Sequence, residues 1–304
     1  MNATSTAQSF DFNAWMQSQL QRTEVALTQW VGVQAPAGLG EAMRYAVLDG
    51  GKRLRPLLVI AACEAVNGNA EAALRAACAV ELIHAYSLVH DDMPCMDNDV
   101  LRRGKPTVHV QFGEAAALLS GDALQALAFE LLTPEGDAVP SAMQAALCRL
   151  LARAAGAQGM AGGQAIDLAS VGVALTEAQL RQMHKLKTGA LLEGSVMMGA
   201  ACAQTDQAVQ QALHAYGEAL GLAFQVVDDV LDVVADSATL GKTAGKDAAN
   251  DKPTYVSLMG LDAARAYAGT LLQESLDALQ HTGLPESRTQ ALRGLAHMVV
   301  DRSH

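Results

Sequence analysis

The stretch EAALRAACAVELIHAYSLVH, residues 71–90, is the part of this sequence that most strongly indicates its fold. Alanine, leucine and other helix-forming residues dominate it, and Asn67-Gly68-Asn69 just before it favours a turn. Apolar side chains occupy most positions rather than a single stripe. Because a helix that is apolar on most sides is usually buried among other helices, the stretch predicts the central helix of a large helical bundle.

Helical patterns also dominate the rest of the chain. The 304 residues are 51% apolar but only 4% aromatic, and alanine and leucine recur, a mixture that favours helix over sheet. No alternating run is long enough to predict a sheet, and no linker or change of composition divides the chain. We therefore expect an all-α protein with a single domain over residues 1–304. The expected helices cover residues 20–30, 56–66, 71–90, 114–132, 142–155, 177–203, 208–234, 262–279 and 288–300.

The overall charge and the cysteines limit the possible partners and the compartment. The formal net charge of −11 gives no overall attraction for nucleic acid or for an anionic membrane. The cysteine count of five is odd, which predicts free thiols in a reducing compartment. The N-terminal residues show no signal-peptide pattern, and apolar runs such as residues 57–62 are too short to cross a bilayer. These features predict a cytoplasmic protein without a membrane span.

An acidic cluster follows the central stretch directly. Residues 90–99 read HDDMPCMDND, so that Asp91, Asp92, Asp97 and Asp99 lie close together in the sequence. Their mutual repulsion is unfavourable unless the carboxylates are solvated or bind cations. Oxygen ligands without paired histidines or thiolates suit a hard cation such as Mg²⁺. A solvated acidic loop at a helix end is the alternative interpretation of this cluster.

A second acidic cluster, QVVDDVLD at residues 225–232, lies inside an expected helix with apolar flanks. Asp228 and Asp232 are one helical turn apart, and Gln225 lies one turn before Asp228 on the same face. Like charges at this spacing destabilise a helix unless something compensates for them. A bound metal ion would do so, which favours a metal site over a solvated surface.

Basic residues are few, but several of them gather beside glycines. Each basic cluster alone is consistent with a solvated patch. Two of them, however, follow the two aspartate clusters, as a carboxylate–metal–diphosphate site requires. The clusters are GGKRLRP (50–56), LRRGKP (101–106), KTG (187–189) and GKTAGKD (241–247).

With these motifs in this order, the chain resembles the short-chain trans-prenyl diphosphate synthases, and within them the bacterial farnesyl diphosphate synthase group. GGQAIDL (162–168) and DKPTY (251–255) extend the resemblance over nearly the whole chain. The four residues between Asp92 and Asp97 match the longer spacing of the bacterial members. The resemblance implies a helical bundle of the isoprenoid synthase type around a deep central cavity, usually as a homodimer. Val256 departs from the proline that often follows the tyrosine of the last motif.

The resemblance also implies a role for each motif residue. Three Mg²⁺ ions would be bound by Asp91, Asp97 and Asp228, with Asp92 in support. Isopentenyl diphosphate would be held by Lys52, Arg55, His84 and Arg103. The allylic substrate, dimethylallyl or geranyl diphosphate, would be held by Arg102, Lys187, Thr188, Gln225 and Lys242. The residues expected to take part in catalysis are Asp91, Asp92, Asp97, Arg102, Lys187, Asp228 and Lys242.

In the implied reaction, the allylic C–O bond breaks to a carbocation, and the double bond of isopentenyl diphosphate attacks it. Tyr86, just before the first aspartates, corresponds to the family's aromatic floor that stops chain growth, and Ser87 is its small neighbour. Helical periodicity alone places Tyr86 well round from Asp91, so ordinary core packing is the alternative for its role. We expect farnesyl diphosphate as the product. Geranyl or geranylgeranyl diphosphate are alternatives, and a terpene cyclase or a non-catalytic helical subunit are more distant ones.

Overall fold

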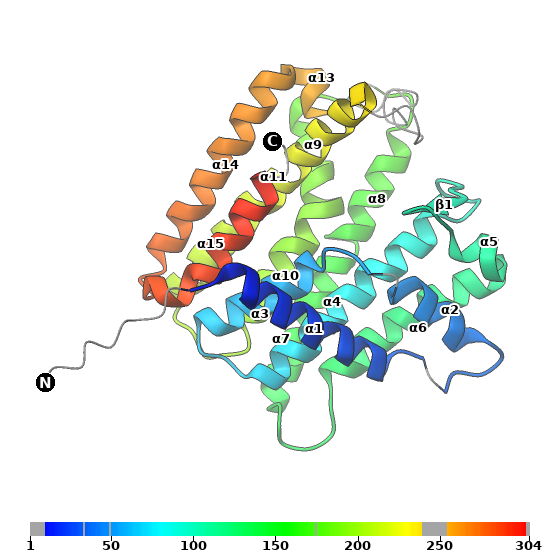
Figure 1. Cartoon of the computed structure of the whole chain (residues 1–304), viewed down its shortest axis with the longest axis horizontal. Coiled ribbons are helices and arrows are strands. Elements are labelled where there is room, and N and C mark those ends of the chain that lie inside the picture. The colour runs from blue at the N-terminus through cyan, green and yellow to red at the C-terminus, as the bar shows by residue number, and fades with distance from the viewer. Residues whose placement is uncertain (1–9, 33, 49, 174, 239–253, 302–304) are drawn as a thin grey trace, which may run out of the picture.

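The computed structural model describes residues 10–32, 34–48, 50–173, 175–238 and 254–301, and over these residues the protein is an all-α bundle, as predicted (Figure 1). The only strands in these residues form a two-stranded antiparallel hairpin, β1 (Leu101–Arg102) and β2 (Lys105–Pro106). The helices of the first half are α1 (Phe12–Trp30), α2 (Leu39–Val47), α3 (Leu54–Ala65), α4 (Ala70–Asp91), α5 (Val108–Phe112), α6 (Glu114–Leu132) and α7 (Ser141–Ala155). Those of the second half are α8 (Met160–Ala169), α9 (Glu177–His184), the π-helix η1 (Lys185–Gly189), α10 (Ala190–Ala200), α11 (Gln207–Ala238), α13 (Tyr255–Met259), α14 (Leu261–His281) and α15 (Glu286–Val300).

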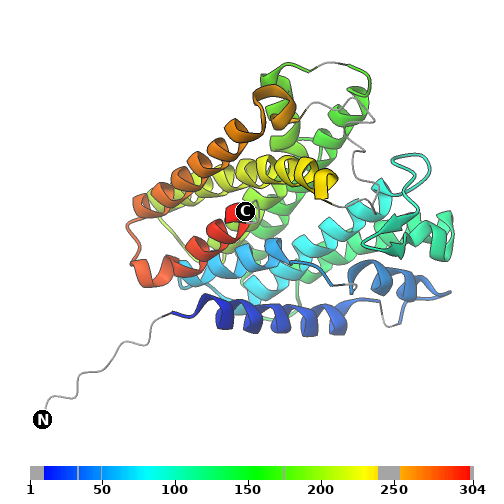
Figure 2. The ribbon, with the colours of Figure 1, turned by 45° about the horizontal axis from the view of Figure 1, so that its top comes forward.

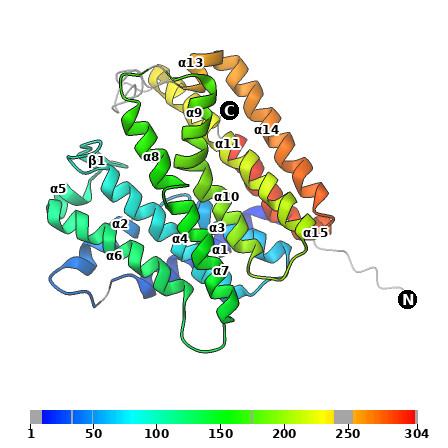
Figure 3. The ribbon, with the colours of Figure 1, turned by 180° about the vertical axis from the view of Figure 1, so that it is seen from behind.

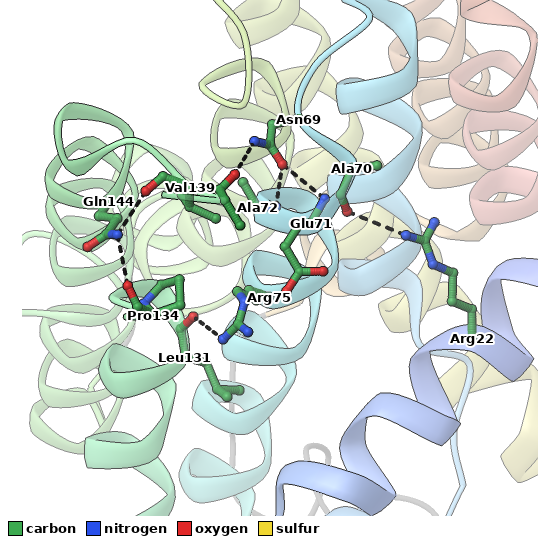
Figure 4. Close-up of polar contacts among 11 residues, drawn as sticks. Arg22, Asn69, Ala70, Glu71, Ala72, Arg75, Leu131, Pro134, Val139 and Gln144 are labelled. Atoms are coloured by element: carbon green, nitrogen blue, oxygen red, sulfur yellow. Dashed lines mark hydrogen bonds and ion pairs between the residues drawn. The ribbon is translucent and has the colours of Figure 1, made fainter. Parts of the chain in front are cut away.

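Helix α4 is the central helix that the sequence predicts. Twelve of its side chains, from Ala72 to Val89, are buried, and many are alanines that let neighbouring helices approach closely. Its start is fixed by Asn69, whose Oδ1 accepts hydrogen bonds at 3.0 Å from the backbone N–H groups of Glu71 and Ala72 (Figure 4). The Asn69 amide also donates to the carbonyl of Ala138 at 2.8 Å, which ties the loop before α7 to this cap.

The other helices surround α4 in groups. Helices α11, α14 and α15 pack together on one side of the bundle (Figures 1 and 2). Helices α2, α5 and α6 pack together on another side, and α7, α8 and α10 cover the face seen from behind (Figure 3). Helix α1 lies along the outside of α3 and α4 (Figure 2).

Two helices correct the sequence argument about membranes. By length and composition alone, α4 and α6 are both apolar enough to cross a bilayer, whereas the sequence argument considered only shorter apolar runs. In α4, 67% of the most apolar window is buried inside the protein, as expected for a core helix. In α6 the buried share is 39%, so part of an apolar face remains exposed, including Leu118 and Leu119.

Several helix boundaries confirm the sequence predictions, and others differ. The helix expected at 114–132 is α6 with the same ends, and the Thr176–Gln179 pair forms a capping box at the start of α9. The continuous helix expected over 177–203 is instead divided into α9, η1 and α10, because a π-helical turn occupies the Lys-Thr-Gly segment. Helices α2, α5, α8 and α13 were not predicted.

Candidate active site

The first aspartate motif begins at Asp91, the last residue of α4, and continues into a tight loop. The Asp97 N–H donates to the Asp91 carbonyl at 2.9 Å, and Asn98 adopts a left-handed φ of 52° that lets the loop fold back. The longer spacing of this motif therefore still brings Asp97 beside Asp91. Burial raises the pKa of Asp91 to about 6; Lys187 opposes this shift, and the charge of Asp97 adds to it.

Asp92, which the resemblance assigns a supporting role, binds Arg102 in this structure. Its buried carboxylate accepts three hydrogen bonds from Arg102. Two come from Nε, at 3.0 and 2.8 Å, and one comes from Nη2, at 2.6 Å. This fork-like ion pair joins the end of α4 to the hairpin β1–β2. In the described structure Arg102 is thus bound to Asp92, and its role toward a substrate stays a prediction.

Lys187 lies in the π-helix η1, between α8 and α11. Its ammonium donates to Asp167 Oδ2 at 2.6 Å, so the GGQAIDL motif on α8 holds the Lys-Thr-Gly motif. Gly163 makes this approach possible, because a Cβ at this position would lie 2.1 Å from the backbone nitrogen of Lys187. Since π-helical turns commonly occur at functional sites, this segment is a second component of the candidate site.

The second aspartate motif lies on α11. Asp229 is buried and accepts from the Gln225 amide at 2.9 Å and from the Tyr255 backbone N–H at 2.8 Å, so it ties α13 to α11. Asp228 is half-buried and lines a cavity, whereas Asp232 is exposed. Of the three carboxylates, Asp228 is therefore the one placed to bind a ligand in that cavity.

Two cavities share Arg55 and His84 in their linings, and these two residues are here called the junction of the cavities. The first, here called the tail cavity, has a volume of about 370 Å³ and reaches from Asp91 to Tyr86 and Ser87. Besides Arg55 and His84, its lining includes Leu88, His90, Met96, Met160, Ala161, Gln164, Ala165, Leu168, Lys187 and Thr188. The second, the arginine cavity, has a volume of about 480 Å³. It is lined by all four residues predicted to hold isopentenyl diphosphate, Lys52, Arg55, His84 and Arg103, and by Asp228.

The side chains at the junction of the two cavities have shifted pKa values. Burial lowers the pKa of His84 well below its ordinary value, and the neighbouring cations Arg55 and Arg103 lower it further. Burial also lowers the pKa of Arg55, while the carboxylates of Glu81 and Asp228 oppose this shift. His84 is therefore neutral, and the positive charge at the junction is carried by guanidinium groups.

The aspartates suit a metal ion whose ligands come partly from the protein and partly from a bound substrate. Among the described residues, no group of three or more histidine, cysteine or carboxylate side chains forms a closed metal site. The possible metal ligands form two separate sets, Asp91 with Asp97 and Asp228 by itself. Both sets supply only carboxylate oxygens. Mg²⁺ commonly takes one or two carboxylates together with waters and phosphate oxygens, so this donor set suits it.

The structure brings together most of the predicted site residues and adds others. Lys242 and Arg302 lie outside the described residues. Tyr86 lines the tail cavity although helical periodicity alone did not indicate this. His90, Met96, Met160, Gln164 and Leu168 line the same cavity and were not singled out from the sequence. The GGQAIDL motif was the available signal for Gln164.

Comparison with known proteins places the chain among isoprenoid enzymes. Residues 36–292 match the family model described as polyprenyl synthetase. A farnesyl diphosphate synthase of Haemophilus influenzae is 46% identical over 277 residues, covering 90% of this chain and 92% of that protein. A chloroplastic geranylgeranyl pyrophosphate synthase of Catharanthus roseus is also 46% identical, over 276 residues, covering 90% and 77%. Among solved structures, an FPP/GFPP synthase of Zymomonas mobilis matches with a TM-score of 0.84 and 42% identity, covering 95% and 98% of the two chains.

Proposed function

Because the chain belongs to the polyprenyl synthetase family, and is therefore a trans-prenyl diphosphate synthase, we propose that its main product is farnesyl diphosphate. Relatives named for farnesyl and for geranylgeranyl products match this chain at the same identity of 46%, so overall similarity does not separate the two. The proposal rests on one observation, the position of Tyr86 in the tail cavity.

Tyr86 stands on α4 between the first aspartates and the deeper core. Its ring packs edge-on against His90, with 5.7 Å between the ring centroids, and the side chain of Gln125 on α6 lies near its hydroxyl. A phenol held by two neighbours narrows the cavity in a fixed position. A prenyl chain that grows away from Asp91 would meet this ring, and further addition of isoprene units would then stop.

The two cavities suggest how the substrates divide. Isopentenyl diphosphate binds in the arginine cavity, where Lys52, Arg55 and Arg103 supply charge-assisted hydrogen bonds to its diphosphate. The allylic diphosphate binds near Asp91 and Lys187, with its apolar chain in the tail cavity. Since both cavities reach Arg55 and His84, the two reacting carbon atoms would meet there.

Members of this family generally use Mg²⁺, and the site carboxylates suit it. Asp91, Asp97 and Asp228 would hold the ions, which neutralise charge on the departing diphosphate when bound. Within the protein, Asp92 and Arg102 fix the end of α4, and Lys187 supplies a cation from the opposite wall.

Product analysis tests the proposal directly. The enzyme is supplied with isopentenyl and dimethylallyl diphosphates, and the dephosphorylated alcohols are separated by chromatography. We expect farnesol from the wild type and longer alcohols from Tyr86→Ala. Geranylgeraniol as the main wild-type alcohol would favour the alternative product. An unchanged chain length in a folded, active Tyr86→Ala variant would place the floor elsewhere.

A homodimer is the second part of the proposal. The exposed apolar side chains Val110, Leu118 and Leu119 lie on α5 and α6, and a second copy of this chain would cover them. Sedimentation equilibrium should give twice the chain mass for the wild type. Leu119→Glu should shift the population toward the monomer, whereas a wild-type protein that is monomeric at micromolar concentration would contradict this part.

A further inference from the structure

Helix α15 contributes one side chain, Met298, to the wall of the arginine cavity. The helix packs against α3, α11 and α14 (Figure 1). Ala291 and Leu295, which lie four and seven residues before this end of the helix on the same face as Met298, are 5% and 0% exposed. Met298 is only half-buried and lines the cavity. The buried apolar face of α15 therefore ends at the cavity, with Met298 as its last member.

The main chain of α15 is held firmly on the rest of the bundle. The buried hydroxyl of Tyr216 on α11 donates to the Leu292 carbonyl at 2.8 Å. On another side, Gly294 lets α1 approach, because a Cβ at this position would lie 2.2 Å from the ring of Phe12. Val299, the residue after Met298, is fully buried. Because the backbone is fixed on both sides, the width of the cavity at this point depends on the Met298 side chain.

Few apolar side chains have free surface in the arginine cavity. Its apolar lining residues are Leu54, Phe224 and Met298. Leu54 is only 6% exposed, whereas Phe224 and Met298 are half-buried. Apart from Gly51, the other lining residues carry charged or imidazole side chains. Most of the apolar surface that a ligand in this cavity can contact therefore belongs to Phe224 and Met298.

This lining suits a ligand with one anionic end and one apolar end. Isopentenyl diphosphate has a diphosphate for the cations and a branched five-carbon group that gains from apolar contact. Phe224 lies one turn before Asp228 and belongs to the second aspartate motif. Met298 comes from a separate helix and lies beyond residues 36–292, the part of the chain that matches the family model. It is thus a part of the wall that the motifs do not describe.

We propose that Met298 borders the space for the isopentenyl group and sets the largest homoallylic diphosphate that the enzyme accepts. This inference rests on the proposed prenyl-transfer function and on its division into two cavities. The chemistry is the same for a larger homologue. Its double bond forms the new C–C bond at the allylic carbon, the allylic C–O bond breaks with its electron pair on the diphosphate, and one proton is lost. Met298 takes no part in these steps and acts only through its volume.

The decisive variant is Met298→Ala, which enlarges the cavity at this wall. The two substrates to compare are isopentenyl diphosphate and a homologue in which an ethyl group replaces its methyl group, each with dimethylallyl diphosphate as partner. Met16→Ala is the matched control, because Met16 on α1 is also half-buried and packs on the same apolar cluster, but lines neither cavity. Met298→Leu conserves most of the volume and is the second control.

The measured quantity is the ratio of kcat/KM for the two homoallylic substrates. One methylene in an apolar pocket is worth about 10–200-fold, so the wild type should favour isopentenyl diphosphate by at least about tenfold. In Met298→Ala this preference should fall by about tenfold or more, whereas both controls should keep it within about twofold. The KM of dimethylallyl diphosphate should stay within about twofold, because the tail cavity is intact. Both alanine variants should melt slightly below the wild type, since each loses a half-buried side chain.

Three results would overturn the inference. An unchanged preference in a folded Met298→Ala variant would place the wall elsewhere. An equal loss of preference in Met16→Ala would indicate general loosening of the bundle rather than a local wall. A change in the selection among allylic substrates, with the homoallylic preference intact, would show that Met298 borders the other substrate. If Met298→Ala did not fold, Met298→Val, which removes less volume, would decide by the same ratio. If the wild type failed to condense isopentenyl and dimethylallyl diphosphates, the proposed function itself would fail, independently of Met298.

Discussion

Arg53 provides a quantitative test of how the turn before α3, which carries Lys52, is held in place. Its side chain is 3% exposed and donates to Glu24 Oε1 on α1 at 2.6 Å and to Glu81 Oε1 on α4 at 2.7 Å. It also donates to the Val47 carbonyl at the end of α2 at 2.6 Å. Arg53→Met leaves the Glu81 carboxylate, 7% exposed, without its partner. Breaking a buried ion pair from one side costs about 3–5 kcal/mol.

The expected change in melting temperature follows from the chain length. An unfolding entropy of about 2.1 cal/mol/K per residue gives roughly 0.6 kcal/mol/K for 304 residues, so Arg53→Met should lower the melting temperature by about 5–8 °C. Adding Glu81→Met should restore part of this loss, because the unpaired Glu81 charge is removed while the buried Arg55 keeps only Asp228 as a nearby carboxylate. Lys185→Met is the control: its ion pair with Glu218 is about half exposed, and its loss should cost under about 1 kcal/mol. An effect of Arg53→Met as small as that of the control would refute the reasoning.

Three further predictions concern the site and the pH dependence of stability. Asp91→Asn and Asp228→Asn should each abolish condensation, and Asp91→Asn should leave the melting temperature near wild type, since it removes a carboxylate whose charged form is disfavoured by burial; a near-normal turnover of either variant would contradict the metal assignment. Lys52→Ala should raise the KM of isopentenyl diphosphate, and Lys187→Ala should raise the KM of the allylic substrate. Each increase should be about 10–150-fold, which corresponds to the loss of one charge-assisted hydrogen bond. If each variant raised the KM values of both substrates equally, the division into two cavities would be refuted. Burial lowers the pKa of His184 to about 4. Between pH 4 and about 6.5 the unfolded state therefore binds more protons than the folded state. As the pH decreases through this range, the free energy of unfolding should fall by up to about 1.4 kcal/mol per pH unit. Urea titrations across this pH range should show that the free energy of unfolding decreases less steeply in His184→Gln than in the wild type. An identical pH dependence in both proteins would show that His184 is not its cause.

The helices that the sequence predicts well are those whose composition and ends agree. Helix α6 begins after Gly113 and ends before Thr133, and its ends match the prediction. Helix α8 was missed because Gly162 and Gly163 weaken helix propensity, whereas in the structure Gly163 is required by close packing on η1. Local propensity therefore argued against a helix that tertiary packing stabilises.

The candidate site was predictable in its residue types but not in all its geometry. The motifs identified Asp91, Asp228 and the cations, since carboxylates and arginines in that order indicate bound diphosphate. They did not show that Asp229 would be used internally, by Gln225 and Tyr255. Periodicity failed for Tyr86 because the tail cavity borders α4 over much of its circumference, so residues that lie on different helical faces line the same space.

The junction of the two cavities suggests why histidine and arginine occur together there. Arg55 carries a charge that a diphosphate can neutralise, and a guanidinium does not lose its proton at any pH relevant to the folded protein. His84 is kept neutral by burial and by the arginines around it, so its pKa is low and its imidazole adds hydrogen-bonding capacity without a second fixed charge. A protonated His84 would stand beside the space where the proposed reaction develops an allylic cation, and would oppose it. In the proposed reaction, burial and the adjacent arginines would together keep the imidazole of His84 neutral, so that it adds no further positive charge beside the tail cavity.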